Sequence, residues 1–181
     1  TNSDQPPIEE IAHEAASQAA PPDPAAGGDG LDSKGLALSQ ILHRVSDPYS
    51  VASGGRWEIP WLEVEPANLV EVARRFRDHR DLEMRMLHCL LVVDYGEQLQ
   101  LVYILFSPAQ GHKTMLKVHV PASNPTVDSV ASLWLGAEWY EREMHDLFGV
   151  VFEGAANTDP LVLYEGFNGH PGLKSFPLHD Y

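Results

Sequence analysis

Six side chains that could carry chemistry lie close together between positions 138 and 146. They are Glu138, Glu141, Arg142, Glu143, His145 and Asp146. Glu141 and His145 are four residues apart, so on a helix they would share one face and could offer a carboxylate and an imidazole to a metal ion. A small metal-dependent enzyme that uses these two residues is therefore one hypothesis for this chain.

The same cluster is also typical of the polar surface of an ordinary helix. Arg142 is four residues from both Glu138 and Asp146, the spacing of common helix ion pairs. Metal sites in helical bundles take Glu and Glu-x-x-His ligands from several helices, whereas this sequence has one such helix and a different spacing. We therefore expect no metal in this chain, and we expect Arg142 to be structural or interfacial.

Other catalytic and cofactor patterns lack essential residues. The only cysteine, Cys89, lies in an apolar run, so the chain cannot hold an iron–sulfur cluster or a zinc ion with several thiolates. No Gly-x-Ser-x-Gly is present, and the glycines at 27–30 do not follow a strand pattern. The sequence therefore predicts neither a catalytic site nor a cofactor of its own.

The charge balance excludes several classes of partner. The chain has 12 Lys and Arg against 26 Asp and Glu, a net charge of −14. This excess of negative charge argues against binding to nucleic acid or to an anionic lipid surface. The longest apolar runs, at 101–106 and 89–93, are far shorter than the roughly 20 residues of a membrane span. Without a signal-peptide pattern at 1–20, we expect a cytosolic chain.

The composition changes near residue 55 and divides the chain into four segments. Residues 1–33 are rich in Ala, Pro and Gly and are expected to form a flexible tail. Residues 34–55 are expected to hold a helix and a linker, and residues 56–153 an α+β domain. Residues 154–181 lack apolar periodicity, and an arm that lies along a neighbouring subunit would explain so long an unpatterned segment.

Apolar periodicity predicts the elements that position the cluster. The first helix has its apolar stripe at Leu38, Ile41, Leu42 and Val45, with Ser33 as the predicted N-cap and Pro48 as the stop. A strand at 56–64 and a helix at 66–78 follow, the latter with Leu69, Val70, Ala73 and Phe76 on its buried face.

Three further strands are predicted at 86–94, 99–107 and 113–120, before a helix at 130–148 with a break near Gly136. Gly149 is expected to end this helix in a left-handed conformation, ahead of a short strand at 150–152. The order predicts an α+β fold: a single mixed, mainly antiparallel sheet with helices packed on one face and an extended C-terminal arm.

The helix cluster belongs to a longer run that resembles a known family. The run at 141–150, Glu-Arg-Glu-Met-His-Asp-Leu-Phe-Gly-Val, resembles the signature of the 30 kDa subunit of the proton-pumping NADH:quinone oxidoreductase, respiratory complex I. Residues 87–95, 117–125 and 132–139 resemble the family's strand ending in Val-Asp-Tyr, its Asn-Pro loop and its Trp-rich approach to the helix. The resemblance extends over about residues 57–181.

The resemblance implies a non-catalytic structural or assembly subunit in the hydrophilic peripheral arm of a redox-driven proton pump. Such a subunit packs on the large 49 kDa-type subunit and near the iron–sulfur subunits, as part of a hetero-oligomer on the cytoplasmic face of the membrane. It has no cofactor; iron–sulfur clusters, and flavin or Ni–Fe in some assemblies, belong to partner subunits. The motif positions carried over, as partner-binding residues, are Glu141, Arg142, Glu143, Asp146, Gly149, Gly169, His170, Pro171, Lys174, Phe176 and Pro177.

The arm departs from the family pattern, because arginines that the family has after its Phe-x-Gly are absent from residues 154–160 and from 169–177. The stretches 145–148 and 161–164 lean towards the related energy-converting membrane-bound hydrogenases and formate hydrogenlyases. The alternatives left open are the same structural role in such a hydrogenase, the metal-dependent enzyme, and a free-standing adaptor module.

Overall fold

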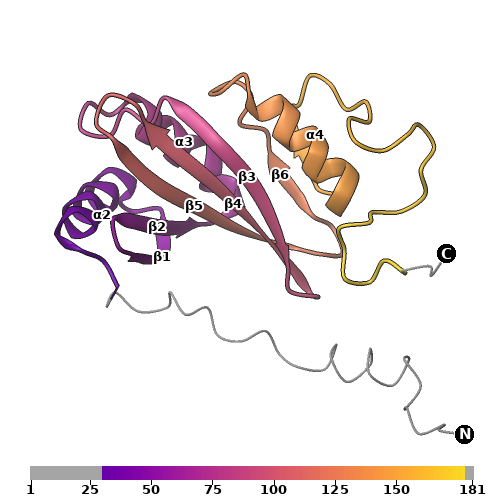
Figure 1. Cartoon of the computed structure of the whole chain (residues 1–181), viewed down its shortest axis with the longest axis horizontal. Coiled ribbons are helices and arrows are strands. Elements are labelled where there is room, and N and C mark those ends of the chain that lie inside the picture. Colours follow the sequence, from indigo (N-terminus) through magenta and orange to yellow (C-terminus); the bar gives the residue numbers. More distant parts are fainter. Residues whose placement is uncertain (1–29, 178–181) are drawn as a thin grey trace, which may run out of the picture.

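The sheet is the element on which the rest of the fold is built (Figure 1). The structure is a computed structural model that describes residues 30–177, so most of the tail predicted at 1–33 lies outside the described residues. The strands are β1 (Ser50–Arg56), β2 (Ile59–Val64), β3 (Met86–Asp94), β4 (Gln98–Ser107) and β5 (His112–Pro121). Their order is β1-β2-β5-β4-β3, with β2 parallel to β5 and every other pair antiparallel. The predicted mixed, mainly antiparallel sheet is confirmed.

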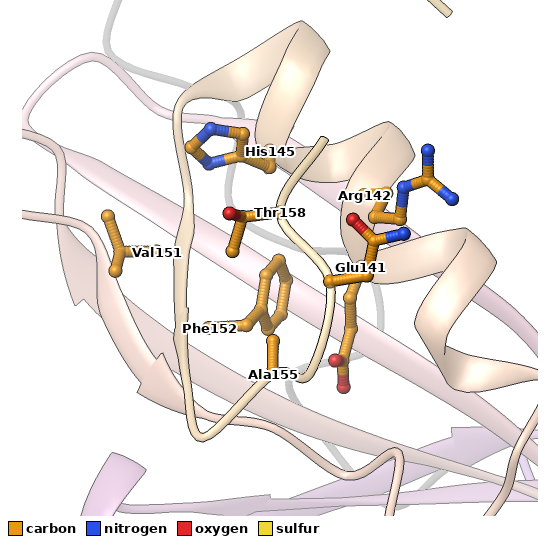
Figure 2. Close-up of a pocket in the computed structure, with 8 residues that line it drawn as sticks. Glu141, Arg142, His145, Val151, Phe152, Ala155 and Thr158 are labelled. Atoms are coloured by element: carbon orange, nitrogen blue, oxygen red, sulfur yellow. The ribbon is translucent and has the colours of Figure 1, made fainter. Parts of the chain in front are cut away.

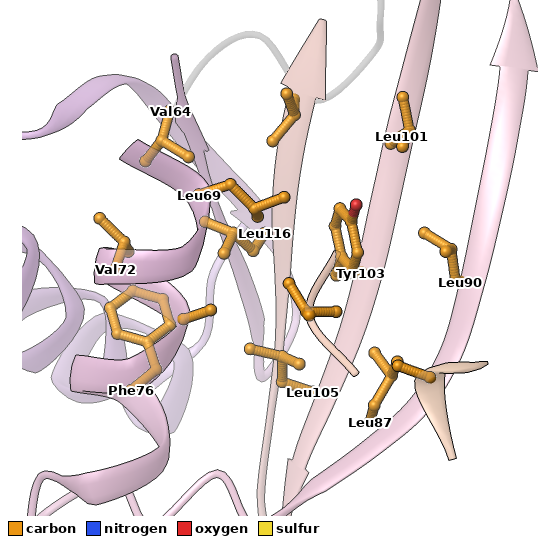
Figure 3. Close-up of a cluster of buried hydrophobic side chains, with 14 of the residues drawn as sticks. Val64, Leu69, Val72, Phe76, Leu87, Leu90, Leu101, Tyr103, Leu105 and Leu116 are labelled. Carbon is orange, nitrogen blue, oxygen red and sulfur yellow. The ribbon is translucent and has the colours of Figure 1, made fainter. Parts of the chain in front are cut away.

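The helices that the structure describes between residues 30 and 177 lie on one face of this sheet and share one core with it. They are α2 (Ser33–Ser46), the 3₁₀ turn η1 (Pro66–Asn68), α3 (Leu69–Asp78) and α4 (Ala137–Phe148). Strands β6 (Thr126–Asp128) and β7 (Val151–Glu153) form a small parallel pair beside α4. Alternate residues of β4 enter the core, namely Leu99, Leu101, Tyr103 and Leu105. Within residues 30–177 they share it with residues of α2, α3 and α4; Figure 3 shows Leu69, Val72 and Phe76 of α3 beside Leu101, Tyr103 and Leu105.

Strand β1 occupies residues that the composition predicts to be a linker. The strand predicted at 56–64 begins only at Ile59, because the chain turns at Trp57; β1 and β2 form a hairpin in which Arg56 pairs with Ile59. The apolar pattern could not reveal β1, since its middle residues are small and exposed. Gly55 allows the close approach: a Cβ there would lie 2.8 Å from Pro60 Cα.

Two helices begin at other residues than predicted, because side chains bind the backbone N–H groups near their starts. Asp32, not Ser33, is the N-cap of α2, because its carboxylate accepts the N–H groups of Lys34 and Gly35 at 3.0 and 2.9 Å. Helix α4 begins at Ala137 rather than at 130. Residues before Gly136 form turns instead, and the N–H of Val130 bonds to a side chain farther along the chain.

Within residues 30–177, no helix combines the length and the apolar character that crossing a bilayer requires.

The contact between α2 and the β1–β2 hairpin yields a test of the packing. A Cβ on Gly35 would collide with the carbonyl oxygen of Trp57 and lie 2.8 Å from a methyl of Leu31. Gly35→Ala gains about 1 kcal/mol of helix propensity, but we expect a net loss of about 1–3 kcal/mol because the collision is with backbone. Thermal unfolding of the full chain measures this loss. Gly136→Ala is the control, since nothing lies within 4 Å of the added methyl; equal melting temperatures would contradict the packing.

Candidate functional site

Helix α4 is held in place by a C-terminal cap and by buried residues on the side that faces the sheet. Gly149 ends it with a φ of 74°, as predicted, and donates its N–H to the carbonyl of His145 at 2.9 Å. Ala137 and Met144 are buried in the core on the side that faces β3. The polar residues of the motif therefore stand at defined positions around a rigid helix.

Glu141 points inward and joins α4 to the segment that follows β6. The residue is only 2% exposed, and its two carboxylate oxygens accept the Ser129 hydroxyl at 2.6 Å and the Val130 N–H at 2.8 Å. Burial raises the pKa of the Glu141 carboxyl, although both hydrogen bonds oppose the increase. Glu141 is therefore a buried structural carboxyl.

Arg142 turns the other way and holds the C-terminal arm. Its guanidinium donates to the carbonyl oxygens of Asp159 at 2.9 Å and of Pro160 at 3.1 Å, and it lies 5.5 Å from the ring centre of Trp139. Figure 2 shows the two adjacent side chains, Glu141 and Arg142, leaving the helix in different directions. Among the described residues, the ion pairs predicted from the helical spacing are replaced by these contacts, because the arm folds back across the helix.

Asp146 gathers three consecutive amides of the arm. One carboxylate oxygen accepts the N–H groups of Leu161, Val162 and Leu163 at 2.8, 2.8 and 3.2 Å. Burial alone would raise the pKa of Asp146, but the three hydrogen bonds outweigh it and hold the pKa below its ordinary value. Successive amides around one carboxylate form the kind of nest that binds anions in proteins.

His170 closes the arm over the end of α4. Its Nδ1 bonds to the carbonyl oxygen of Asp146 at 2.9 Å, and its ring lies against Gly149, where a Cβ would be only 2.8 Å from ring atoms. Gly149 thus serves two purposes, since it adopts the left-handed conformation and leaves room for His170. Leu147 adds a backbone contact, its carbonyl accepting the N–H of Gly172 at 2.8 Å.

Asp94, at the end of β3, is a site residue that the sequence analysis missed. Its carboxylate accepts the N–H of Gly96 at 2.7 Å and the backbone N–H of Lys174 at 2.8 Å. Lys174 therefore reaches the domain through its backbone rather than through its charge. The sequence feature that could have indicated Asp94 is a carboxylate at the end of an apolar strand, in the stretch that resembles the family's Val-Asp-Tyr.

We call Asp94, Arg142, Asp146, Gly149 and His170 the arm-anchoring cluster. The structure brings these five residues together around the arm. Of the other predicted residues, Gly169 and Phe176 contact each other within the arm, Pro171 and Pro177 are exposed, and Glu143 is half-buried. Phe176 also stacks on Phe167 with ring centres 6.0 Å apart.

The geometry does not support a metal-dependent enzyme. Both oxygens of Glu141 are engaged, and His145 Nδ1 bonds to the carbonyl oxygen of Val150 at 2.9 Å. No group of three or more His, Cys, Asp or Glu residues within 30–177 is arranged to hold a metal ion. The cavity between α4 and the arm (Figure 2) holds about 60 Å³, well below the roughly 300 Å³ at which small-molecule sites begin.

A wider, open groove lies at the other end of α4. It has a volume of about 670 Å³ and runs between the start of β3 and the first turn of α4. Leu135 and Trp139 line it and are 89% and 60% exposed. Large apolar side chains exposed in this way are typical of a surface that meets another protein.

Because Asp146 accepts three amides of the arm, we expect its removal to release the arm locally. Asp146→Ala removes the acceptor of three amides, and a hydrogen bond to a charged group contributes about 1.5–3 kcal/mol. Because about 1.4 kcal/mol corresponds to a factor of ten, we expect hydrogen exchange at Leu161, Val162 and Leu163 to become at least about tenfold faster. Mass spectrometry of the exchanged chain measures it. Glu143→Ala on the same helix is the control, and unchanged exchange in Asp146→Ala would contradict the anchoring.

The raised pKa of Glu141 leads us to expect that the free energy of unfolding depends on pH. Its pKa is raised by burial, so the folded chain binds this proton more tightly than the unfolded chain, in which Glu titrates near about 4.3. This contribution to the free energy of unfolding is fully present below about pH 4.3 and is lost as the pH rises through the folded pKa.

Glu141→Gln can still donate to Ser129 and accept from Val130 but does not titrate. We expect its urea-unfolding midpoint to fall less than that of the wild type between about pH 4 and 7. Glu143→Gln, on the same helix, should retain the wild-type slope, because Glu143 is not among the groups that shift the pKa of Glu141. Identical slopes in all three proteins would show that Glu141 does not carry the effect.

Comparison with known proteins finds a family and relatives with similar sequences. Residues 62–181 match the family model described as respiratory-chain NADH dehydrogenase, 30 Kd subunit. An NADH-quinone oxidoreductase subunit of Roseiflexus castenholzii (strain DSM 13941 / HLO8) is 41% identical over 120 residues, which cover 65% of this chain and 69% of that protein.

Two solved structures have the same fold. The trypsin-resistant fragment (1–134) of Nqo5 superimposes with a TM-score of 0.55 at 26% identity, covering 66% of this chain and 98% of the fragment. A chain of an archaeal respiratory membrane complex, the membrane-bound sulfane sulfur reductase, has a TM-score of 0.71 at 24% identity and covers 81% of this chain and 87% of its own length. The helix motif, the sheet and these matches agree: the chain belongs to the family of the 30 kDa subunit of respiratory-chain NADH dehydrogenase.

Proposed function

We propose that this chain is a non-catalytic structural and assembly subunit in the hydrophilic peripheral arm of a complex I-like, redox-driven proton pump of the NADH:quinone oxidoreductase type. Its family membership and the named relative support this role. In this proposal, iron–sulfur clusters, and flavin or Ni–Fe where present, are bound by partner subunits. The complex is membrane-associated, and this subunit lies on its cytoplasmic face.

The way in which the arm is held is the observation that carries the proposal. Arg142 and Asp146 bind backbone atoms of the arm, so the side chains at 161–164 remain available to a neighbour. Val162 and Tyr164 are 54% and 71% exposed. An arm of fixed path with exposed apolar side chains suits a permanent interface, in which such side chains become buried.

The groove beside α4 extends the same surface. Trp139 lines the groove and the Arg142 guanidinium lies 5.5 Å from its ring centre. Trp and Arg are among the residue types that most often dominate binding energy at interfaces. We assign this surface to the large 49 kDa-type subunit. Iron–sulfur subunits of the peripheral arm complete the hetero-oligomer.

An energy-converting hydrogenase or a formate hydrogenlyase would use the same surfaces in the same structural role. The stretches at 145–148 and 161–164 are the sequence features that favour this second assembly. The subunits that co-purify with the chain distinguish the two.

The test is the assembly of an affinity-tagged full chain in cells, measured on native gels with iron analysis and mass identification of the subunits. We expect the chain to migrate with an iron–sulfur-bearing large subunit, and Arg142→Ala to reduce the yield of this complex, because the carbonyl contacts to Asp159 and Pro160 are lost. Arg80→Ala is the control, since the Arg80 side chain is 90% exposed on the loop before β3.

Unchanged complex yield in Arg142→Ala would contradict the role of the arm. A stoichiometric metal or a visible cofactor spectrum from the isolated chain would contradict the non-catalytic assignment as a whole.

A further inference from the structure

The turn between β1 and β2 presents an aromatic side chain that the core does not use. Trp57 is 64% exposed, and its backbone has a φ of 55°, a conformation that bulky residues rarely adopt. A glycine or an asparagine would make the same turn at a lower conformational cost. Neither core packing nor the shape of the turn therefore explains a tryptophan at this position.

Arg56 makes the same turn cationic as well as aromatic. Its guanidinium carbon lies 4.6 Å from the ring centre of Trp57. Arg56 forms no ion pair with any carboxylate of residues 30–177, whereas the arginines of α3 are each paired with Glu71 or Asp78. We call Arg56 and Trp57 the hairpin patch. An exposed Trp and Arg in contact form a surface suited to an apolar group that carries a carboxylate.

The chain enters the domain beside the hairpin patch. The N–H of Trp57 donates to the carbonyl oxygen of Gly30, and the N–H of Asp32 donates to the carbonyl oxygen of Trp57 at 2.8 Å. A Cβ on Gly30 would lie 3.8 Å from the Arg56 side chain. Residues that precede Gly30 are therefore tethered next to Arg56 and Trp57.

The residues before Gly30 have the composition that this patch would bind. Residues 1–29 contain no Lys or Arg, and their acidic side chains are Asp4, Glu9, Glu10, Glu14, Asp23 and Asp29. The sequence at 21–24 is Pro-Pro-Asp-Pro. Proline-rich segments dock on exposed aromatic side chains in several families of recognition domain, and an aspartate among the prolines supplies the carboxylate.

The length of the connection fits a contact within one chain. Five residues join Pro24 to Gly30, two of them glycines that permit a sharp change of direction. Such a connection reaches about 20 Å when it is fully extended. A tether this short acts like a ligand concentration of about 1 mM, so even a weak contact is populated.

We propose that residues 21–24 of this chain dock on the hairpin patch as an intrachain strap, with proline rings against Trp57 and the Asp23 carboxylate opposite Arg56. The strap attaches to the domain a segment whose composition gives it no core of its own. The inference goes beyond the proposed function and does not depend on it, because the strap uses neither the arm nor α4.

Acrylamide quenching of tryptophan fluorescence tests whether the patch is covered in the full chain. Trp61 and Trp134 are only 6% exposed, whereas Trp57 and Trp139 are 64% and 60% exposed. In the Trp139→Phe chain, the indole of the hairpin patch is therefore the one that acrylamide can reach when the strap is absent. We expect weak quenching of this chain, and an increase of at least about twofold when Pro22→Ser, Asp23→Lys and Pro24→Ser release the strap.

The Trp57→Phe chain is the matched control, because its exposed indole is Trp139 on α4. The same three substitutions should leave its quenching unchanged. Strong quenching of the Trp139→Phe chain, equal with and without the three substitutions, overturns the strap. Quenching that weakens as the chain is concentrated, together with a dimer mass, shows that a second copy covers the patch and also overturns it.

A charge exchange tests the pairing of Asp23 with Arg56. In the Trp139→Phe chain, Asp23→Lys alone should increase quenching, and adding Arg56→Glu should restore part of the protection, which general disruption of the turn could not do. Glu14→Lys should have no effect, since Glu14 lies outside residues 21–24. Failure of the exchange to restore protection overturns the pairing, and an equal effect of Glu14→Lys overturns the assignment to these four residues.

Discussion

The arm depends on one physical constraint: its own turns pair only some of its backbone N–H and C=O groups, so its path across α4 depends on partners in the domain. Helix α4 supplies them from both sides of its polar face. Asp146 accepts three consecutive amides, and Arg142 donates to the two carbonyl oxygens that precede them along the chain. One carboxylate and one guanidinium therefore determine the path of the arm where it crosses the helix. The negative charge of Asp146 is in turn stabilised by the amides that it orders.

The motif helix divides its polar residues among separate structural tasks. Glu141 holds the preceding segment from within, Arg142 and Asp146 hold the arm, and Gly149 leaves room for His170. Because Arg142 and Asp146 bind the arm through its backbone, arm side chains other than His170 can differ without loss of these hydrogen bonds. The lack of arginine at residues 154–160 and 169–177 does not affect these hydrogen bonds, because they use the arm's backbone.

Elements with strong periodicity could be predicted from the sequence, and contacts between distant segments could not. Strands β3, β4 and β5 match the predicted strands to within a residue or two, because alternation or an unbroken apolar run marks each of them. Strand β1 has small, polar residues, and its pairing with β2 provides its stability. The ion pairs predicted for Arg142 were wrong because helical spacing reports only neighbours on the same helix, whereas its partners are carbonyl groups seventeen and eighteen residues away. Asp94 was missed for the same reason, since its partner Lys174 is eighty residues away.

The parallel pairing of β2 with β5 has a consequence for how the chain is made. Trp61 lies opposite Met115, so an early-synthesised strand acquires its neighbour only after the intervening helix and two further strands have emerged from the ribosome. Until then the inner edge of the β1–β2 hairpin has unpaired backbone groups and is open to pairing with another nascent chain. Closing so long a loop is entropically slow. Biogenesis of this subunit therefore favours conditions that shelter the hairpin edge until translation has passed β5.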